Sequence, residues 1–465
     1  MSCNWRIRKL GDLVTFMSGG TPSKSNKDYW DGEIPWISAS SMQSTRYSDS
    51  DLLVTEKGSH NGTRLVPKDT VLLLVRGSAL HNKIPVGITT REVTFNQDVK
   101  ALIPKTPEIT PFYLLSWLIS IKGFLLTKVE NTGIGAGKLD TKILQDLDMP
   151  IPPNDELLRL ESFCKALDEK IILNEAINQT LEQMVQALFK SWFVDFEPVK
   201  AKIAVLEAGG SQEEATLAAM TAISGKDADL LAFFEHEHPE QYAELKATAE
   251  LFPSAMQDSD LGGIPDGWWN GCIGNIIARA KNRVGSTRAT VFSAIAVGEL
   301  VPSDEHFRKQ VYSKSIEKYI LVEPWDFAYN PSRVNIGSIG INDKNINGAV
   351  SPVYVVFKPI IDYRWFISIF TKTNYFKNNV SMLASGSVRQ SLSYEELASI
   401  SLCIPEVNIV NCFNNKYEKI LKCIESNLHQ NDTLNYIRDT LLPRLLSGEI
   451  TLPEAEQSVS EAENV

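Results

Sequence analysis

The stretch LLRLESFCKALDEKIILNEAINQTLEQMVQALFKSW, residues 157–192, decides how this chain is organised. Apolar side chains recur in it at alternating intervals of three and four residues, which is typical of a long helix that pairs with another helix. The stretch therefore predicts a helix of about 40 residues, about 60 Å long, with one apolar seam. The seam positions are Leu157, Leu160, Cys164, Leu167, Ile171, Asn174, Asn178, Leu181, Val185, Leu188 and Trp192.

A second copy of this helix lies near the C-terminus. Residues from Gly133 onward match residues from Gly386 onward without gaps, at an offset of 386 − 133 = 253. The second seam breaks its spacing only at Arg438, where the neighbouring Ile437 can fill the gap. The chain is therefore two copies of one unit, each a head followed by a long helix. The second seam comprises Val410, Phe413, Tyr417, Ile420, Ile424, Asn427, Asn431, Leu434, Leu441 and Leu445.

Both seams carry asparagines at the same two places, Asn174 and Asn178 in the first and Asn427 and Asn431 in the second. If the helices pair antiparallel, their midpoints coincide and the four amides hydrogen-bond in one central layer. A slipped register would bury unpaired amides, at about 1–3 kcal/mol for each lost group. The alternative is that these asparagines face solvent beside a shorter seam.

The heads combine short β-rich runs, such as Thr70–Val75 and Val353–Phe357, with clusters of Gly, Pro, Ser and Asn. We predict an α/β fold class, with two mixed α/β heads separated by two long helices. These helices form an antiparallel coiled coil within one chain, which gives a pseudo-twofold internal repeat. The expected order is a first head at 1–153, a helix at 154–197, an acidic helical linker at 198–263, a second head at 264–405, a helix at 406–448 and an acidic, disordered tail at 449–465.

Charge is distributed unevenly along the chain, whose net charge is −11. Residues 1–150 sum to +3 and residues 264–405 to +4, whereas the helices, linker and tail are acidic. Basic heads permit nucleic-acid binding without requiring it. No run approaches the roughly 18 apolar residues of a membrane span, which favours a cytoplasmic location.

Motifs for catalysis or metal binding are not recognisable. Asn330-Pro-Ser-Arg333 lacks the Pro-Tyr half of the Asn-Pro-Pro-Tyr motif of adenine methyltransferases, and Gly133–Leu139 has the wrong spacing for an ATP-binding loop. His236 and His238 are alternate residues, which do not share a helix face. We expect no catalytic residue, no metal and no cofactor in this chain.

Short motifs follow one another along nearly the whole chain. They are Trp5, Leu10-Gly-Asp-Leu13, Ser18-Gly-Gly-Thr-Pro-Ser23, Ile34-Pro-Trp-Ile37, Ile151-Pro-Pro153, Phe189-Lys-Ser-Trp-Phe-Val-Asp-Phe196, Gly263-Ile-Pro-Asp-Gly-Trp268 and Leu441-Leu-Pro-Arg-Leu-Leu-Ser-Gly448. Their order and the duplicated plan resemble the specificity subunits of type I restriction-modification systems. One departure is that the second head has Ala278–Ser286 where the first has its Gly-Gly-Thr-Pro loop.

The resemblance implies that the heads are target-recognition domains, each of which reads one half of an asymmetric bipartite DNA target, while the helices set the spacing. It implies three kinds of partner: double-stranded DNA, two modification (methyltransferase) subunits and two restriction (motor-nuclease) subunits. S-adenosylmethionine, and ATP with magnesium for restriction, would be bound by those other subunits. The alternative is a coiled-coil scaffold that binds proteins and reads no DNA.

Candidate DNA contacts are loop side chains, because Arg and Lys suit guanine and Asn and Gln suit adenine. In the first head they are Thr21, Ser23, Ser38, Ser40, Arg76, Ser78, His81, Asn82, Lys83 and Lys138. In the second head they are Arg279, Lys281, Arg283, Arg333, Asn335, Arg389 and Gln390. Lys138 and Arg389 lie in loops suited to phosphate contact. The apolar helix ends either pack the helices together or dock methyltransferase subunits; they comprise Phe189, Trp192, Phe193, Leu445 and Leu446.

Overall fold

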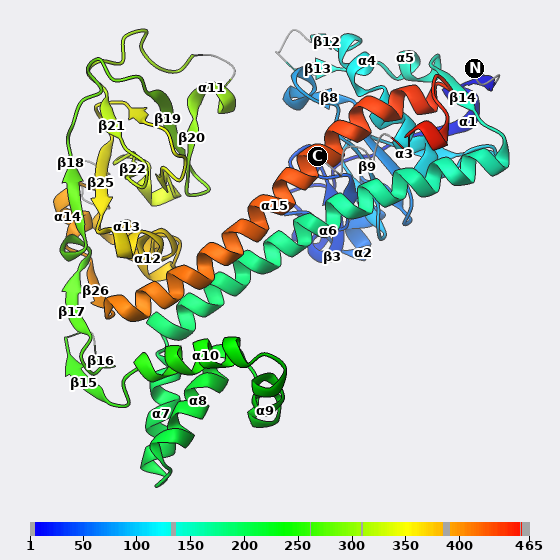
Figure 1. Cartoon of the computed structure of the whole chain (residues 1–465). Helices are drawn as coiled ribbons and strands as arrows, with labels where there is room; N and C mark the ends of the chain where they lie inside the picture. Colours follow the sequence, from blue (N-terminus) through cyan, green and yellow to red (C-terminus); the bar gives the residue numbers. More distant parts are fainter. Residues whose placement is uncertain are drawn as a thin grey trace. The chain divides into compact units, whose positions relative to one another are not determined.

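The computed structural model divides into two compact units (Figure 1). Unit 1 comprises Met1–Ile177 and Glu425–Val465, and unit 2 comprises Asn178–Ile424. Each long helix therefore contributes one part to each unit. The structure describes residues 5–131, 136–260, 262–307, 310–384, 391–455 and 457.

The first head, in unit 1, holds two main sheets. One has the strand order β2-β11-β7-β9-β4, which runs through Val14–Ser18, Val99–Pro104, Val71–Leu74, Val86–Thr89 and Arg46–Tyr47. The other has the order β5-β3-β10-β6, which runs through Leu53–Val54, Trp30–Ile37, Val93–Phe95 and Leu65–Val66. Every residue of β7 is buried, which explains its uninterrupted apolar run. Helix α3 (Pro111–Ser120) packs on β7 and β9 and completes this core.

The second head, in unit 2, repeats this strand order. Its sheet β18-β25-β22-β23 runs through Ile277–Ala280, Val355–Pro359, Phe327–Tyr329 and Ile339–Ile341. Its sheet β20-β19-β24-β21 runs through Glu299–Pro302, Thr290–Ile295, Gly348–Val350 and Ile320–Val322. Both heads contain a parallel pair at the same place, β3 with β10 and β19 with β24. The first head has a second parallel pair, β4 with β9, and β4 is the strand by which its five-stranded sheet exceeds the four-stranded sheet of the second head. The predicted α/β class and the internal repeat are both confirmed.

The elements that close the heads match at the offset of the sequence repeat. Strand β14 (Asp148–Ile151) pairs antiparallel with β1 (Arg6–Lys9), as β26 (Ser401–Ile404) pairs with β17 (Trp269–Cys272). The same offset relates α5 (Thr141–Gln145) to α14 (Tyr394–Ala398), and α6 (Asn154–Phe193) to α15 (Val407–Leu446). Helix α6 ends before residue 197 because Phe196 adopts a left-handed φ of 55°.

Helices α6 and α15 pair antiparallel within each unit. In unit 1, Leu167 and Ile171 pack with Leu434, and the start of α6 joins the end of α15 in the core of the first head. Ile437 is 5% exposed in that core, so it fills the gap beside Arg438 as predicted. In unit 2, Val185 belongs to the same core as the start of α15.

Three of the four seam asparagines are buried and bonded between the helices. Asn174 Nδ2 donates to Asn431 Oδ1 at 2.9 Å, and Asn431 Nδ2 donates to the carbonyl oxygen of Ile171 at 3.3 Å. In unit 2, Asn178 Nδ2 donates to the carbonyl oxygen of Ile424 at 3.4 Å. Asn427 is half-buried. The solvent-facing alternative is therefore wrong for Asn174, Asn178 and Asn431.

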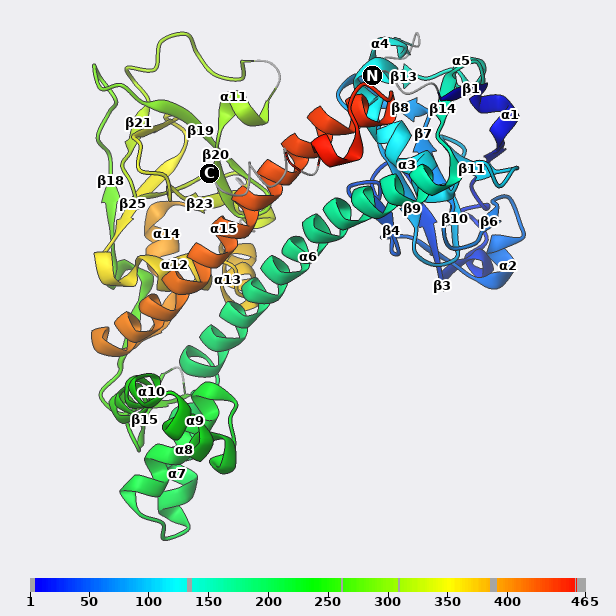
Figure 2. The ribbon, with the colours of Figure 1, turned by 45° about the vertical axis from the view of Figure 1, so that its right-hand side comes forward.

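The acidic segment after α6 forms the four helices α7 to α10, which Figure 2 shows clustered together. Residues Ala219, Met220, Leu231, Leu245 and Ala249 form its own apolar core. The predicted helical character is confirmed, and the segment is more than a connection because it buries a core. Its helices are α7 (Glu197–Glu207), α8 (Gln212–Ser224), α9 (Ala228–Glu237) and α10 (Pro239–Leu251).

The start of the acidic tail departs from the prediction of disorder. Ala455 is fully buried in the core of unit 1, and Ile450 and Leu452 pack against that core. Residues 452–455 are helical. The tail's acidic composition concealed these three apolar contacts, so the prediction is wrong for this part. Among the described residues, no helix is both long and apolar enough to cross a membrane.

Candidate nucleic-acid interface

The first-head loops that carry candidate residues meet at one edge. Strands β3 and β10 are parallel, so their carboxyl ends lie together, and Asn96 N donates to the carbonyl oxygen of Ile37 at 3.0 Å. Ser38 follows β3 directly, and its hydroxyl shares a 2.9 Å hydrogen bond with that of Ser40. The turn at residues 96–98 is the centre around which the other loops gather.

The Gly-Gly-Thr-Pro loop is held against this turn by its backbone. Gly20 N donates to the carbonyl oxygen of Phe95 at 2.9 Å, and Thr21 Oγ1 donates to Gln97 Oε1 at 2.7 Å. A Cβ atom on Gly19 would lie 2.2 Å from the oxygen of Phe95, so only glycine allows this approach. The loop thus places Thr21 at the turn, with Ser23 exposed beyond it.

The loop after β7 reaches the same turn. Arg76 N donates to the carbonyl oxygen of Asp98 at 3.3 Å. Strand β8 (Arg76–Gly77) pairs with β13 (Gly137–Lys138) in a register that sets Arg76 opposite Lys138. Lys138 Nζ lies 3.1 Å from Asp140 Oδ2, so its charge is partly balanced. The short helix η2 (Ser78–His81), which carries two further candidates, follows directly.

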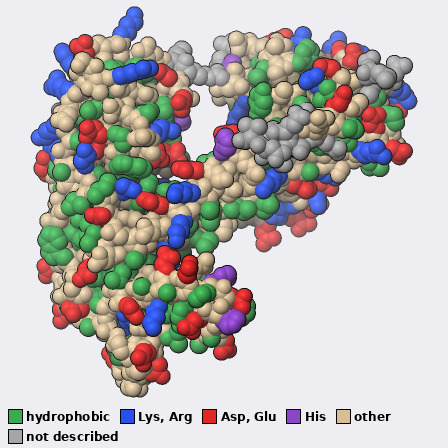
Figure 3. Space-filling view, viewed as in Figure 1, with side chains coloured by type: hydrophobic (Ala, Val, Ile, Leu, Met, Phe, Trp, Pro, Cys, Tyr) green, Lys and Arg blue, Asp and Glu red, His purple; other side chains and the backbone are tan. Residues whose placement is uncertain are grey.

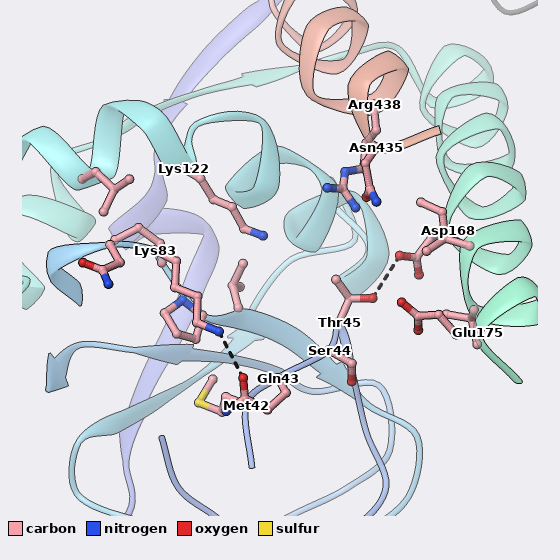
Figure 4. A pocket seen from close by; sticks show the side chains of 17 residues that line it. Met42, Gln43, Ser44, Thr45, Lys83, Lys122, Asp168, Glu175, Asn435 and Arg438 are labelled. Atoms are coloured by element: carbon pink, nitrogen blue, oxygen red, sulfur yellow. Dashed lines mark hydrogen bonds between the residues drawn. The ribbon is translucent and has the colours of Figure 1, made fainter. Parts of the chain in front are cut away.

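A cavity of about 410 Å³ lies where this loop approaches the long helices (Figure 4). The candidates Asn82 and Lys83 line it. Lys83 Nζ donates to Gln43 Oε1 at 3.1 Å. Other lining residues come from α4 (Lys122–Thr127), α6 and α15: Lys122, Asp168, Glu175, Asn435 and Arg438. The sequence analysis did not predict that these helices line the cavity, although Arg438 interrupts the apolar seam of the second helix and so marked the place.

The cavity contains an imperfectly balanced set of charges. Asp168 is 6% exposed and accepts from Thr45 Oγ1 at 3.0 Å, while its other oxygen lies 2.7 Å from an Arg46 nitrogen. Burial, together with the nearby positive charge of Arg438, lowers the pKa of Lys122 to about 8, although the carboxylates of Asp439 and Asp168 oppose this shift. Lys122 is therefore a cation that its surroundings stabilise poorly.

The second head places different residues at the equivalent strand ends. The loop after β18, residues 281–289, takes the place of the loop after β2, although it lacks the Gly-Gly-Thr-Pro sequence. Lys281 and Arg283 are exposed in this loop. Arg279 lies on β18 itself, with a guanidinium nitrogen 2.9 Å from Glu395 Oε1.

The loop after β22 is the counterpart of the loop after β7. Arg333 and Asn335 are exposed beside a short helix, η4 (Val334–Ile336), as Ser78 and His81 belong to η2. The Asn-Pro-Ser-Arg segment is a turn that leads into β23, since Asn330 N donates to the carbonyl oxygen of Ser338. Candidates Arg389 and Gln390 lie outside the described residues.

The apolar helix ends do not form a docking surface. Phe189, Trp192 and Phe193 are at most 6% exposed in the core of unit 2, where the Phe193 ring makes edge-to-face contacts with Phe366 and Phe413. Leu445 and Leu446 are each 1% exposed in the core of unit 1. Partner docking through these five side chains is therefore wrong, because the protein's own core already covers them.

Charge on the outside is mixed in sign. Figure 3 shows Lys and Arg side chains interspersed with Asp and Glu on the viewed face of both units. Within the described ranges, no group of three or more His, Cys, Asp or Glu side chains is arranged to hold a metal ion. Exposed loop cations such as Lys281 and Arg283 are nevertheless placed where side chains of their type can contact phosphates or bases.

Comparison with known proteins places these features in a family. Residues 3–183 match the family described as type I restriction modification DNA specificity domain. The chain is 31% identical over 325 residues to the type I restriction enzyme HindI specificity subunit of Haemophilus influenzae, covering 66% of this chain and 70% of that protein. The MjaIX specificity subunit of Methanocaldococcus jannaschii is 23% identical over 456 residues, covering 97% and 94%.

A solved structure, the S subunit of a type I restriction-modification system from M. genitalium, aligns over 95% of this chain and 96% of its own. Its sequence identity is 13% and the TM-score is 0.46. The duplicated heads and paired helices define a protein with two similar recognition modules. The chain belongs to the specificity subunits of type I restriction enzymes.

Proposed function

We propose that this chain reads DNA through its two heads, each of which recognises one half of an asymmetric bipartite target. The observation that carries this proposal is the repeated strand order with different side chains at equivalent loops. Arg76 and Lys83 follow β7, whereas Arg333 and Asn335 follow its counterpart β22. One scaffold thus presents two sets of hydrogen-bonding groups, which suit two different base sequences.

Helices α6 and α15 set the distance between the half-sites. Each is 40 residues long, and buried amides such as Asn174 and Asn431 fix their register. A fixed register is what a spacer needs, because a slip of the helices would change the separation of the heads. Since α6 and α15 bury their seams against each other within the chain, the seams are not available for oligomer formation, which disfavours the scaffold alternative.

The chemistry belongs to partner subunits. Two modification subunits would bind S-adenosylmethionine and methylate the target, and two restriction subunits would use ATP with magnesium. The internal repeat supports paired partners, because it supplies two similar surfaces for two identical subunits. These surfaces involve exposed residues outside the buried helix ends, and the chain itself acts without a catalytic residue.

The test is methylation mapping of host DNA by long-read sequencing. The modification subunit is expressed with this chain and, as the matched control, without it. We expect adenine methylation at one bipartite motif with two unlike halves, only when this chain is present. A complex of the two proteins that methylates no defined motif would contradict DNA reading and favour the scaffold function.

A further inference from the structure

Arg438 occupies a seam position that its repeat counterpart fills with an apolar residue. The counterpart in α6 is Val185, which is 3% exposed in the core of unit 2. Arg438 has a side-chain exposure of 16% and forms an ion pair with the adjacent, exposed Asp439 at 2.9 Å. A guanidinium at an apolar seam costs stability, because desolvation is poorly compensated. This loss of stability suggests that the positive charge of Arg438 binds a ligand.

Three cations approach the cavity of unit 1 from separate elements. Lys122 begins α4, Arg438 lies on α15 and Lys83 follows η2. Figure 4 shows Lys122 and Arg438 directed into the same space. Two carboxylates, Asp168 and Glu175, also line the cavity, so the lining keeps an excess of one positive charge (3 − 2 = 1). Asp168 pairs with Arg46 and Arg438 pairs with Asp439, and these two outer partners cancel each other in the balance.

The position of the cavity connects it to the DNA-reading loop. Asn82 and Lys83, which line the cavity, continue the loop that begins at Arg76 beside Lys138. A strand of DNA that contacts Arg76 offers further phosphates nearby, since phosphates follow one another about every 3.4 Å of helix axis along each strand.

We infer that Lys83, Lys122 and Arg438 bind a backbone phosphate of the DNA beside the first half-site. This inference rests on the proposed function. The phosphate supplies the negative charge that the cavity lacks, and the contact is independent of base sequence. It also makes the heads unequal: Val185 stands where a matching arginine would be needed, so the second head holds the backbone without this helix contribution.

The test measures binding of the full chain to a fluorescent duplex across a series of salt concentrations. The variants are Lys122→Gln, Arg438→Gln and the pair, with Lys128→Gln and Arg444→Gln as matched controls. Lys128 follows α4 and Arg444 lies on α15, and both are exposed outside the cavity lining. Thermal unfolding of each variant shows whether it remains folded.

We expect the paired variant to reduce the slope of log Kd against log salt by about 1, the contribution of one phosphate, and each single variant to reduce it by less. Binding should weaken equally on any sequence, while the controls keep the wild-type slope. Unchanged slopes in folded variants would overturn the inference and leave the proposed function intact. Wild-type chain that binds no DNA would instead contradict the proposed function. If inorganic phosphate stabilises the wild type but neither cavity variant, and DNA slopes do not change, the site serves a free anion and the DNA assignment is wrong.

Discussion

The two heads share strand order but differ in their loops and in what the long helices add to them. Glycines hold the first loop of the first head against the turn at residues 96–98, whereas the second head has the exposed Lys281 and Arg283 at that place. Helix α15 brings Arg438 to a cavity in unit 1, and α6 brings Val185 to an apolar core in unit 2. Duplication thus preserved the framework, while the surfaces that determine recognition diverged.

The largest expected effect comes from breaking the core of one unit. Trp192 is fully buried, with ring centroids 5.1 Å from Phe252 and 6.2 Å from Phe413. Trp192→Ala should lower the free energy of unfolding by about 3–5 kcal/mol, since it leaves a large cavity. Hydrogen exchange should accelerate in unit 2 only, and the repeat counterpart Leu445→Ala should affect unit 1 only. If either variant accelerated hydrogen exchange equally in both units, the two units would not have separate cores.

A smaller loss of stability is expected at the asparagine layer. Asn174→Leu removes the donor that satisfies Asn431 Oδ1, which should cost about 1–3 kcal/mol because the oxygen stays buried. Replacing both asparagines by leucine should recover most of this loss, because the pair of amides is then removed together. Urea unfolding compares the wild type, Asn174→Leu, Asn431→Leu and the double variant. A double variant that loses as much as the two single variants together would argue against a direct Asn174–Asn431 interaction.

The comparison between the heads is sharpened by one substitution in each. Arg76→Ala and Arg333→Ala should each weaken recognition by about 1–3 kcal/mol at a base that the side chain contacts. Methylation mapping should show relaxed sequence preference in one half of the motif for Arg76→Ala and in the other half for Arg333→Ala. Relaxation of the same half by both variants would show that the loops are not equivalent.

The smallest effect concerns Lys122, whose folded-state pKa of about 8 lies below its ordinary value of 10.5. At pH 7 the ammonium is charged in both states and its burial destabilises the fold, so Lys122→Met should raise the free energy of unfolding by about 1 kcal/mol. Between pH 8 and pH 10.5 Lys122 loses its proton in the folded wild type while it keeps it in the unfolded chain, so the wild type gains stability. The difference in free energy of unfolding between Lys122→Met and the wild type should therefore narrow. Urea unfolding at pH 7 and pH 10 measures this difference, with Lys128→Met as the control variant. A difference in free energy of unfolding that is larger at pH 10 than at pH 7 would contradict the prediction.

The sequence predicted those features whose signals are local or repeated. Heptad spacing identified both helices, because the same spacing of apolar residues recurs at every turn. The constant offset between Gly133 and Gly386 identified the duplication. Strand order could not be predicted, since the pairing of β3 with β10 joins residues that no local pattern relates.

The site was predicted only in part for a similar reason. Loop candidates such as Arg76 and Lys83 were recognisable by residue type, but Lys122 and Arg438 reach the cavity through tertiary packing. For the helix ends the sequence left core packing and partner docking as alternatives, and the structure supports packing. An aromatic run such as Phe189–Phe193 has the same pattern whether its contacts come from another protein or, as here, from Phe366 and Phe413.

The central claim is that one scaffold carries two independent readers, and replacing one head tests it most directly. Residues 6–151, from the start of β1 to the end of β14, are inserted in place of 269–404, from β17 to β26, because these strands are equivalent. Expressed with the modification subunit and mapped by long-read sequencing, this protein should methylate a motif whose two halves carry the same bases, those of the first half-site. A motif that still has two unlike halves would contradict the account, because the bases would then be read by something other than the heads.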